Sequence, residues 1–551
     1  MLNKGQEKAV NSDAKKILCL AGAGTGKTHS MIARISRLVS EGVNVSNMLV
    51  LTFTNAAARE MKERYSKLHP GEITPMFCTF HAFCYSLIAR DPNIRQYLGY
   101  SSSVVPTIPD ESAVRKLETM CKKQCGVKLS DDKLKGKQAL TRQEQFQYEI
   151  YWRQYNKLMR MENYITFDIM CEGVCKMFTE GNSYTTPYKR RYTHIFVDEF
   201  QDTDPLQWKF VSSFTDANMF VVGDAKQAIY SFRGADSTII KSLAESAEWE
   251  TVKLSQNYRS VKCICDFANK IHKDWTSAAY NLNIDSDKLG GTVSITEEFL
   301  FEGDRALSQM FEILRNPSQE DTYALLCRTN AEVAQVKALL QKANISFRTN
   351  NHGKDVAGIL KSAADSSFMV GWLSDKLSSR EYNNYLRLCA CDSYYETEEG
   401  FMSEYGEKLT RYTKDIFAVR AILESDTFPQ QKCIDIGKLL HLPSSVIELK
   451  DQTTASVVEY LLHEIDSARV ETNIYVGTIH SVKGLEFDIV HLFGVNGKSF
   501  PLTKEEQLNL YYVGCTRAKR ELTIWWSEYD RSLNRYNSHN NFDEEDEPYE
   551  W

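Results

Sequence analysis

Short apolar runs rich in β-branched residues recur along the chain, and each run ends in polar or glycine-rich residues. The clearest examples read KKILCLAG, NMLVLTFTN, THIFVDE, MFVVGD, TYALLCRTN, IYVGTIH and DIVHLFGV. Polar segments with a helical pattern separate these runs. Such alternation is typical of parallel strands that helices cover, because a strand buried on both faces is apolar throughout. The pattern therefore predicts an α/β fold.

The expected strands fall into two groups, one before about residue 250 and one after about residue 290. Two long polar segments that favour helix interrupt the groups. We therefore expect two α/β cores, each with a mainly helical insertion. The expected boundaries are 1–90 and 191–250 for the first core, 91–190 for its insertion, 251–355 and 465–535 for the second core, 356–464 for its reduced insertion, and 536–551 for an acidic, disordered tail.

Composition narrows the class of protein. The chain has 551 residues, which is too long for one hydrophobic core, and its 42% hydrophobic and 25% charged residues are ordinary for a globular protein. The net charge is −7, so any contact with nucleic acid must come from local patches and stacking. We find no apolar run of membrane-spanning length and no signal peptide. We therefore expect mostly free thiols and a protein that is neither secreted nor in a membrane, but in the cytoplasm or wherever any nucleic acid that it binds is located.

One glycine-rich segment follows an expected strand and precedes an expected helix. It reads LCLAGAGTGKTHS, and its loop residues are Ala23, Gly24, Thr25 and Gly26. Backbone N–H groups of such a loop surround phosphates, with Lys27 on the terminal phosphates and Thr28 on Mg²⁺. The strict pattern has glycine where this chain has Ala21. The alternative is a glycine-rich turn that binds no ligand.

A second segment, HIFVDEFQD, is an apolar strand that ends in two acids. Ligands of open α/β sheets bind at the carboxyl ends of the strands. Asp198 is expected to hold Mg²⁺, and Glu199 is expected to orient or deprotonate the attacking water. Alone, such a run is an ordinary strand end, but together with the phosphate loop it indicates ATP hydrolysis.

The order of these and other motifs resembles UvrD/Rep/PcrA-like superfamily 1 DNA helicases. The matching segments are AGAGTGKT, LTFTNAAAREMKER, TFHAFCYSLI, FVDEFQDT, VGDAKQAIYSFRGA, QNYRS, GTIHSVKGLEFDIVHL and YYVGCTRAKREL. They extend from residue 3 to about residue 525 and cover both expected cores. The resemblance implies two RecA-like motor domains with parallel sheets, and an ATP site to which both contribute.

The resemblance also implies contacts with the nucleoside part of ATP. The segment LNKGQEKAV places Gln6 at the adenine edge, where its amide can both donate and accept. Tyr258 would stack on the base, and Glu486 would bind the ribose. Arg34, on the helix after the phosphate loop, is also expected at the ATP site.

A further set of residues would act on the terminal phosphate. Arg259 and Arg517 would reach it from the second core, opposite Lys27 and Glu199 of the first. Gln227 would sense the γ-phosphate from the first core. Taken singly, each of the two arginines is better explained as a solvated surface group.

Contacts with DNA that ignore sequence require stacking on bases and bonds to phosphates. The resemblance places stacking aromatics at Phe53, Tyr230 and Phe232, and coupling or backbone contacts at His81, Arg233 and His480. The family often has Trp where this chain has Phe232, and Lys where it has Ala56. The alternative for the aromatics is burial in the core.

The resemblance implies an enzyme: an ATP- and Mg²⁺-dependent DNA helicase of DNA replication, repair or recombination. It would translocate 3′ to 5′ on single-stranded DNA and act at junctions of single and double strands. Two alternatives stay open. One is a translocase that strips proteins from single strands and unwinds poorly, and the other is a binding module that nucleotide regulates without a motor.

The insertion and the tail raise three further questions. Cys121 with Cys125, and Cys171 with Cys175, have a spacing that puts each pair on one helix face, so a Zn²⁺ or iron–sulfur site is one alternative. The basic segments of the insertion either contact DNA phosphates or only solubilise its helices. The acidic tail either binds a protein partner, competes with DNA, or has no function.

Overall fold

The computed structural model describes most of the two expected cores and the first insertion. The described residues are 2–109, 111–134, 140–272, 277, 279–297, 305–349, 472–495, 500 and 504–526, with short stretches between 360 and 461. Most of the segment expected as the second insertion, and the whole acidic tail, lie outside the described residues.

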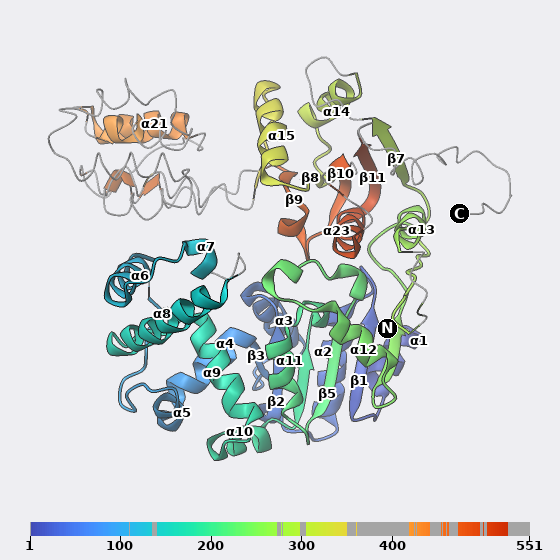
Figure 1. Ribbon diagram of the computed structural model, residues 1–551. Coiled ribbons are helices and arrows are strands. Elements are labelled where there is room, and N and C mark those ends of the chain that lie inside the picture. Colours follow the sequence, from blue (N-terminus) through green and yellow to red (C-terminus); the bar gives the residue numbers. More distant parts are fainter. Residues whose placement is uncertain are drawn as a thin grey trace. The chain divides into compact units, whose positions relative to one another are not determined.

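The first sheet has six strands in the order β3-β2-β4-β5-β1-β6 (Figure 1). They are β1 (Lys16–Ala21), β2 (Met48–Thr52), β3 (Met76–Thr79), β4 (His194–Val197), β5 (Asn218–Gly223) and β6 (Glu250–Leu254). Every pairing among these strands is parallel, and Cys19 of β1 lies between Val222 of β5 and Val252 of β6. Parallel strands place their carboxyl ends at one edge, which is where the loop and the acids lie.

Alternate residues of these strands enter two separate cores. One core contains Ile17, Cys19 and Phe196 and is closed by α1 (Lys4–Asn11), α2 (Lys27–Ser40) and α3 (Asn55–Leu68). The other contains Leu18, Leu20 and residues of α4 (Phe80–Arg90), α9 (Phe167–Thr179), α11 (Pro205–Ser212) and α12 (Ser237–Glu245). Burial on both faces explains the nearly continuous apolar runs of the central strands.

The first insertion is helical in its described part. Besides α9 it contains α5 (Pro92–Tyr97), α6 (Glu111–Cys125), α7 (Asp131–Leu134), α8 (Arg142–Met161) and α10 (Thr186–Arg191). The helices α6 and α8 pack together and share a small core with Cys121, Tyr151 and Leu158. The helix α9 instead packs on α4 and α11, so it joins the insertion to the first sheet.

The second sheet has five strands in the order β7-β11-β10-β8-β9. They are β7 (Thr292–Glu297), β8 (Tyr323–Cys327), β9 (Ile474–Thr478), β10 (Phe487–Val495) and β11 (Ala518–Trp526), accompanied by α13 (Lys262–Ile271), α14 (Arg305–Arg315), α15 (Asn330–Lys342) and α23 (Glu505–Cys515). The pairings of β10 with β8 and β11, and of β11 with β7, are parallel. The predicted α/β class with two parallel sheets is therefore confirmed.

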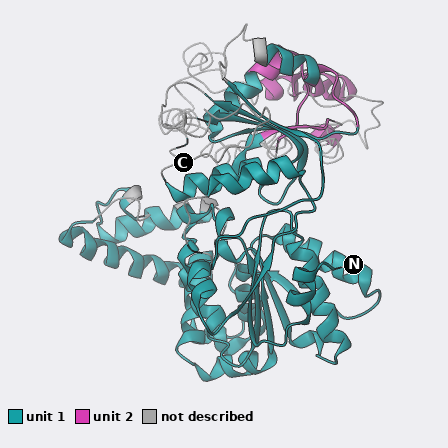
Figure 2. Ribbon diagram, turned by 90° about the vertical axis from the view of Figure 1, so that its right-hand side faces the viewer, with its two compact units in different colours: residues 1–313, 320–338, 477–551 teal, residues 314–319, 339–476 magenta. Residues whose placement is uncertain are grey.

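The chain divides into two compact units, coloured separately in Figure 2. The first comprises residues 1–313, 320–338 and 477–551, and the second comprises residues 314–319 and 339–476, with α21 (Pro429–Leu439) as its longest described helix. Strand β6 runs to Leu254, past the boundary expected at 250. None of the helices in the described part of the chain is long and apolar enough to cross a membrane.

The structure predicts unequal effects for two phenylalanines. Phe196 of β4 is 1% exposed and Phe146 of α8 is 66% exposed. We expect Phe196→Ala to cost about 3–5 kcal/mol, because it leaves a cavity in the core. Phe146→Ala should leave the thermal unfolding midpoint nearly unchanged. Equal midpoints for the two variants in a thermal melt would contradict this packing.

Candidate active site

The phosphate loop spans residues 22–26 between β1 and α2. Gly24 and Gly26 have φ values of 68° and 83°, which favour glycine. Gly26 is also the N-cap of α2 and has no side-chain cap, so the first N–H groups of the helix face the loop. Ala21 is the last residue of β1, paired with Leu254, so it stands where the strand ends and a side chain is accommodated.

Two acids follow β4, on the other side of β5 from the loop. Glu199 has the left-handed φ of 48°, a strained conformation for a residue with a side chain. Its Oε2 lies 3.3 Å from Nζ of Lys27. Burial alone would raise the pKa of Glu199, but Lys27, Lys483 and a hydrogen bond from Gln201 hold it below its usual value. Glu199 is therefore an ionised base beside the phosphate loop.

The pKa of the neighbouring Asp198 is shifted in the opposite direction. Burial, and then the neighbouring Glu199 charge, raise the pKa of its carboxyl. Its Oδ1 is buried and makes no hydrogen bond with the described residues. An oxygen that is buried without a partner, at the carboxyl end of β4, fits a hard cation such as Mg²⁺.

A chain of hydrogen bonds leads away from Glu199. The amide of Gln201 donates to Glu199 Oε2, and Gln201 Oε1 accepts from the backbone N–H of Asp224 at 3.0 Å. Asp224 Oδ2 then accepts from Nε2 of Gln227 at 2.7 Å. Gln227 is only 4% exposed. These bonds join the acid after β4 to the segment after β5.

Lys483, which follows β9, meets the same group of residues. Its Nζ pairs with Asp202, donates to the backbone carbonyl of Gln227 at 2.9 Å, and lies 4.9 Å from the centre of the Tyr230 ring. Burial raises the pKa of Asp202 to about 6 even though Lys483 lowers it. Sequence reasoning missed Lys483, Gln201 and Asp224, although each lies in a segment that it had singled out.

The two expected arginines are held by the segments of the second sheet. Arg517 is 1% exposed and donates to the carbonyls of Val513 and Leu485, so it is no solvated surface group. Burial, and then the nearby Arg259, lower the pKa of Arg517 to about 9. Arg259 donates to Glu486 at 2.8 Å and to the carbonyl of Thr516 at 3.1 Å.

The residues expected at adenine meet at the start of α1. Gln6 caps this helix together with Asn3, and its Nε2 donates to the carbonyl of Thr25 in the phosphate loop. Asn3 also donates to the hydroxyl of Tyr258 at 2.8 Å, and the Tyr258 ring is 48% exposed. Arg34 instead donates to the carbonyls of Ala9, Val10 and Ser12, which favours support of α1 over direct contact with ATP.

Four expected DNA-contact residues form one aromatic cluster. Phe53 and Tyr230 stack with ring centres 4.8 Å apart, and Phe232 contacts both Tyr230 and His480. Phe232 is 64% exposed, so it is not a core residue. The guanidinium of Arg233 lies over the rings of Tyr230 and Phe232. An exposed aromatic surface with a cation suits stacking on bases.

His81 lies apart from this cluster, against α9. Its ring contacts the exposed ring of Phe167 at 5.4 Å, an aromatic that sequence reasoning missed. A hydrogen bond with Cys171, and then nearby Asp204 and Asp168, raise the pKa of His81. Among the described residues no cluster of three or more His, Cys, Asp or Glu is arranged to hold a metal, and Cys121 and Cys171 belong to different hydrophobic clusters.

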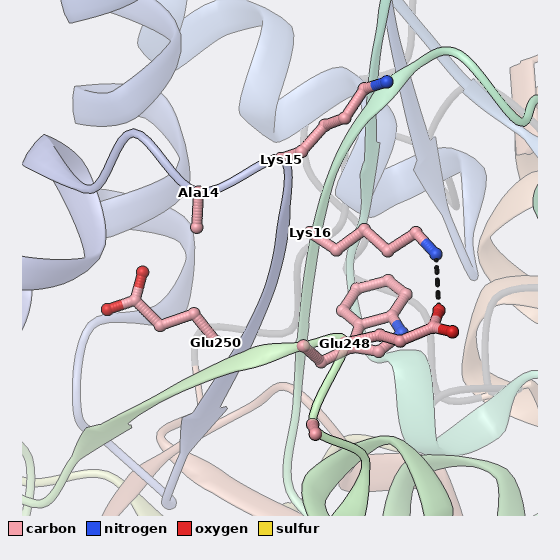
Figure 3. Close-up of a pocket in the computed structure, with 7 residues that line it drawn as sticks. Ala14, Lys15, Lys16, Glu248 and Glu250 are labelled. Carbon is pink, nitrogen blue, oxygen red and sulfur yellow. Dashed lines mark hydrogen bonds and ion pairs between the residues drawn. The ribbon is translucent and has the colours of Figure 1, made fainter.

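A surface pocket of about 530 Å³ lies at the start of β1 and β6, the opposite edge of the sheet from the phosphate loop. It is lined by Lys15, Lys16, Trp249 and the two acids labelled in Figure 3. Lys16 pairs with Glu248, and Glu250 pairs with Lys8. Three of the four charged side chains that line the pocket are therefore paired within the protein.

A parallel sheet whose first strand leads into a phosphate loop, with paired acids after a nearby strand, defines the class of P-loop ATPases. Matches to models of protein families agree with this class. The model of the UvrD/REP helicase N-terminal domain matches residues 2–248, and that of the UvrD-like helicase C-terminal domain matches residues 390–529.

Curated relatives include the ATP-dependent DNA helicases PcrA of Staphylococcus aureus and Staphylococcus epidermidis. Each is 25% identical, over alignments of 607 and 610 residues that cover 95% of this chain and 83% of the relative. The two models together match more than half of the chain. The chain therefore belongs to the UvrD/Rep-like family of ATP-dependent DNA helicases.

Two histidines are predicted to respond differently to pH. The raised pKa of His81 keeps its charge to higher pH than usual, whereas burial, then Arg328, lower the pKa of His480 to about 4. If His81 contacts DNA, affinity should rise as pH falls from 8 to 6, by roughly two- to fivefold for one surface charge. His81→Gln should lose this gain and His480→Gln should keep it. Identical pH profiles of single-strand affinity, at fixed salt, would contradict the prediction.

Proposed function

We propose that this chain hydrolyses ATP with Mg²⁺, translocates 3′ to 5′ on single-stranded DNA, and unwinds duplex at junctions of single and double strands. The observation that carries the proposal is the meeting of Lys27 with Glu199 at the carboxyl edge of the first sheet. A phosphate-binding cation and an ionised base within hydrogen-bond distance suit attack of water on a γ-phosphate.

The roles follow from the environment of each group. Loop N–H groups and Lys27 bind the phosphates, and Glu199 orients water and accepts its proton. Thr28 and Asp198 would hold Mg²⁺, which when bound neutralises charge on the phosphates. Ionisation of Asp198 is costly in its buried site, so a cation there is the natural partner of the carboxylate.

Arg259 and Arg517 are assigned to the charge that develops on the γ-phosphate. The first support is the proximity of Glu199 to Arg517, since the charge of Glu199 acts to raise the pKa of Arg517. The second is the hydrogen bond from the backbone N–H of Tyr258, next to Arg259, to the carbonyl of Gly24 in the phosphate loop. Gln6 and the exposed ring of Tyr258 would hold adenine between them, and Glu486 would bind the ribose.

Coupling between ATP and DNA is assigned to residues 224–233. Gln227 lies at one end, joined to Glu199 through Asp224 and Gln201. Tyr230 and Phe232 lie at the other end, in the aromatic cluster with Phe53 and His480. We infer that a shift of Gln227 on hydrolysis moves the rings on which bases stack.

One set of substrates tests activity and polarity together. Duplexes with a 3′ tail, a 5′ tail or blunt ends should be unwound with ATP and Mg²⁺ only when the 3′ tail is present. Single-stranded DNA should stimulate ATP hydrolysis. Glu199→Gln, which keeps the shape of the side chain but removes the base, should bind the same DNA and lower kcat by roughly 10²-fold or more.

Three outcomes would count against the proposal in different ways. ATP hydrolysis that single-stranded DNA does not stimulate would refute a motor. Preference for the 5′ tail would refute the polarity alone. Displacement of bound protein from single strands without strand separation would favour a translocase.

Phe232 provides a sharper test of the DNA face. Phe232→Ala should weaken single-strand binding by about 1–3 kcal/mol, the usual worth of one stacked base, and should reduce unwinding. ATP hydrolysis without DNA should stay unchanged, because the ring is 64% exposed and outside the phosphate loop. Phe146→Ala, at a ring that is 66% exposed on α8, is the matched control. Equal DNA affinity in both variants would remove Phe232 from the interface.

A further inference from the structure

One buried amide joins the phosphate loop to the segment that carries Arg259. Asn257 lies between β6 and α13 and is 2% exposed. Its Nδ2 donates to the carbonyl of Ala23 at 2.7 Å. Its Oδ1 accepts from the backbone N–H groups of Arg259 and Ser260, both at 2.7 Å. The amide therefore uses its donor side on the loop and its acceptor side on the arginine segment.

The backbones of the two segments are also in direct contact. The N–H of Tyr258 donates to the carbonyl of Gly24 at 2.8 Å, and the N–H of Asn257 donates to the carbonyl of Asp285 at 2.6 Å. A Cβ on Gly24 would lie 2.7 Å from Cβ of Arg259. Such an approach leaves no space for a side chain at residue 24 and places the loop directly against the backbone of Arg259.

Only an amide satisfies both sides of this contact. A carboxylate of the same shape could accept from Arg259 and Ser260, but it would face the carbonyl of Ala23 without a proton to donate. A buried carbonyl that loses its donor, and a charge placed beside it, are both unfavourable. Substitution by Asp therefore separates the loop from the arginine segment and leaves side-chain volume unchanged.

The side chain of Arg259 is held from the other direction. It pairs with Glu486 and donates to the carbonyl of Thr516, and both residues belong to segments next to strands of the second sheet. The backbone of Arg259 is thus tied to the phosphate loop and its guanidinium to the second core. The position of the guanidinium relative to the phosphates depends on both attachments.

We propose that Asn257 is a positioning residue for ATP hydrolysis, whose amide holds the backbone of Arg259 at a set distance from the phosphate loop. This inference rests on the proposed action of Arg259 at the γ-phosphate. Loss of the amide should then impair the transition state more than the binding of ATP, because the loop, Gln6 and Lys27 are retained.

The test compares Asn257→Asp and Asn257→Ala with wild type in DNA-stimulated ATP hydrolysis. We expect kcat to fall roughly 10- to 100-fold, with less than about a threefold change in KM for ATP. Asn163→Asp is the matched control, because its amide also donates to a backbone carbonyl, that of Val105, in a partly buried contact of the helical insertion. This control should retain the wild-type kcat.

A double-mutant comparison shows whether Asn257 acts through Arg259. Arg259→Ala should lower kcat, and adding Asn257→Asp should lower it no further. If the two reductions multiply, or if the Asn257 variants have wild-type kcat, the inference is wrong while the proposed function stands. If Arg259→Ala has wild-type kcat, the proposed role of Arg259 is wrong, and the inference about Asn257, which depends on that role, is wrong as well.

A measurement on the unaltered protein covers the case in which the variants do not fold. The amide hydrogens of Arg259 and Ser260 should exchange slowly with deuterium, because Asn257 accepts from both. Exchange as fast as that of the exposed Gly71 turn would show that the contact does not form, and would overturn the inference.

Discussion

The balance of buried charge at the carboxyl edge of the first sheet controls the rest of the site. Asp198 and Asp202 are buried, and Glu199 lies beside them in a strained backbone conformation. Lys27 is the first residue of α2, directly after the phosphate loop, whereas Lys483 comes from the segment after β9. Buried carboxylates without cations are costly, and the lysine that follows β9 in the second sheet offsets part of this cost. The pair of Lys483 with Asp202 joins the two cores, and the proposed hydrolysis relies on the neighbouring charges of Lys27 and Glu199.

Hydrogen bonds and the contacts of Lys483 connect these buried acids with the aromatic cluster. Gln201 joins Glu199 to Asp224, and Lys483 contacts both the carbonyl of Gln227 and the ring of Tyr230. A displacement at the acid therefore has a direct path of contacts to the rings.

Local pattern predicted some elements and missed others for physical reasons. Strands β1, β4 and β5 are buried on both faces and were recognised as apolar runs. The edge strand β6 has an exposed Lys253 and a half-buried Glu250, so its sequence ETVKL lacks such a run. The residue type alone favours a surface position for Arg517, yet the carbonyls of Val513 in α23 and of Leu485 accept its hydrogen bonds and allow its burial.

By itself, the sequence determined the α/β class, the phosphate loop, the acids after β4 and the order of motifs, because each depends on residues close together in the chain. Tertiary structure alone decided which distant groups meet. Lys483 and Asp202 are 281 positions apart, and Asn257 and Ala23 are 234 apart. The residues next to each partner in the sequence do not indicate either contact. An ion pair or an amide contact depends on the distance between two groups and on their burial, and both are set only when the two sheets fold.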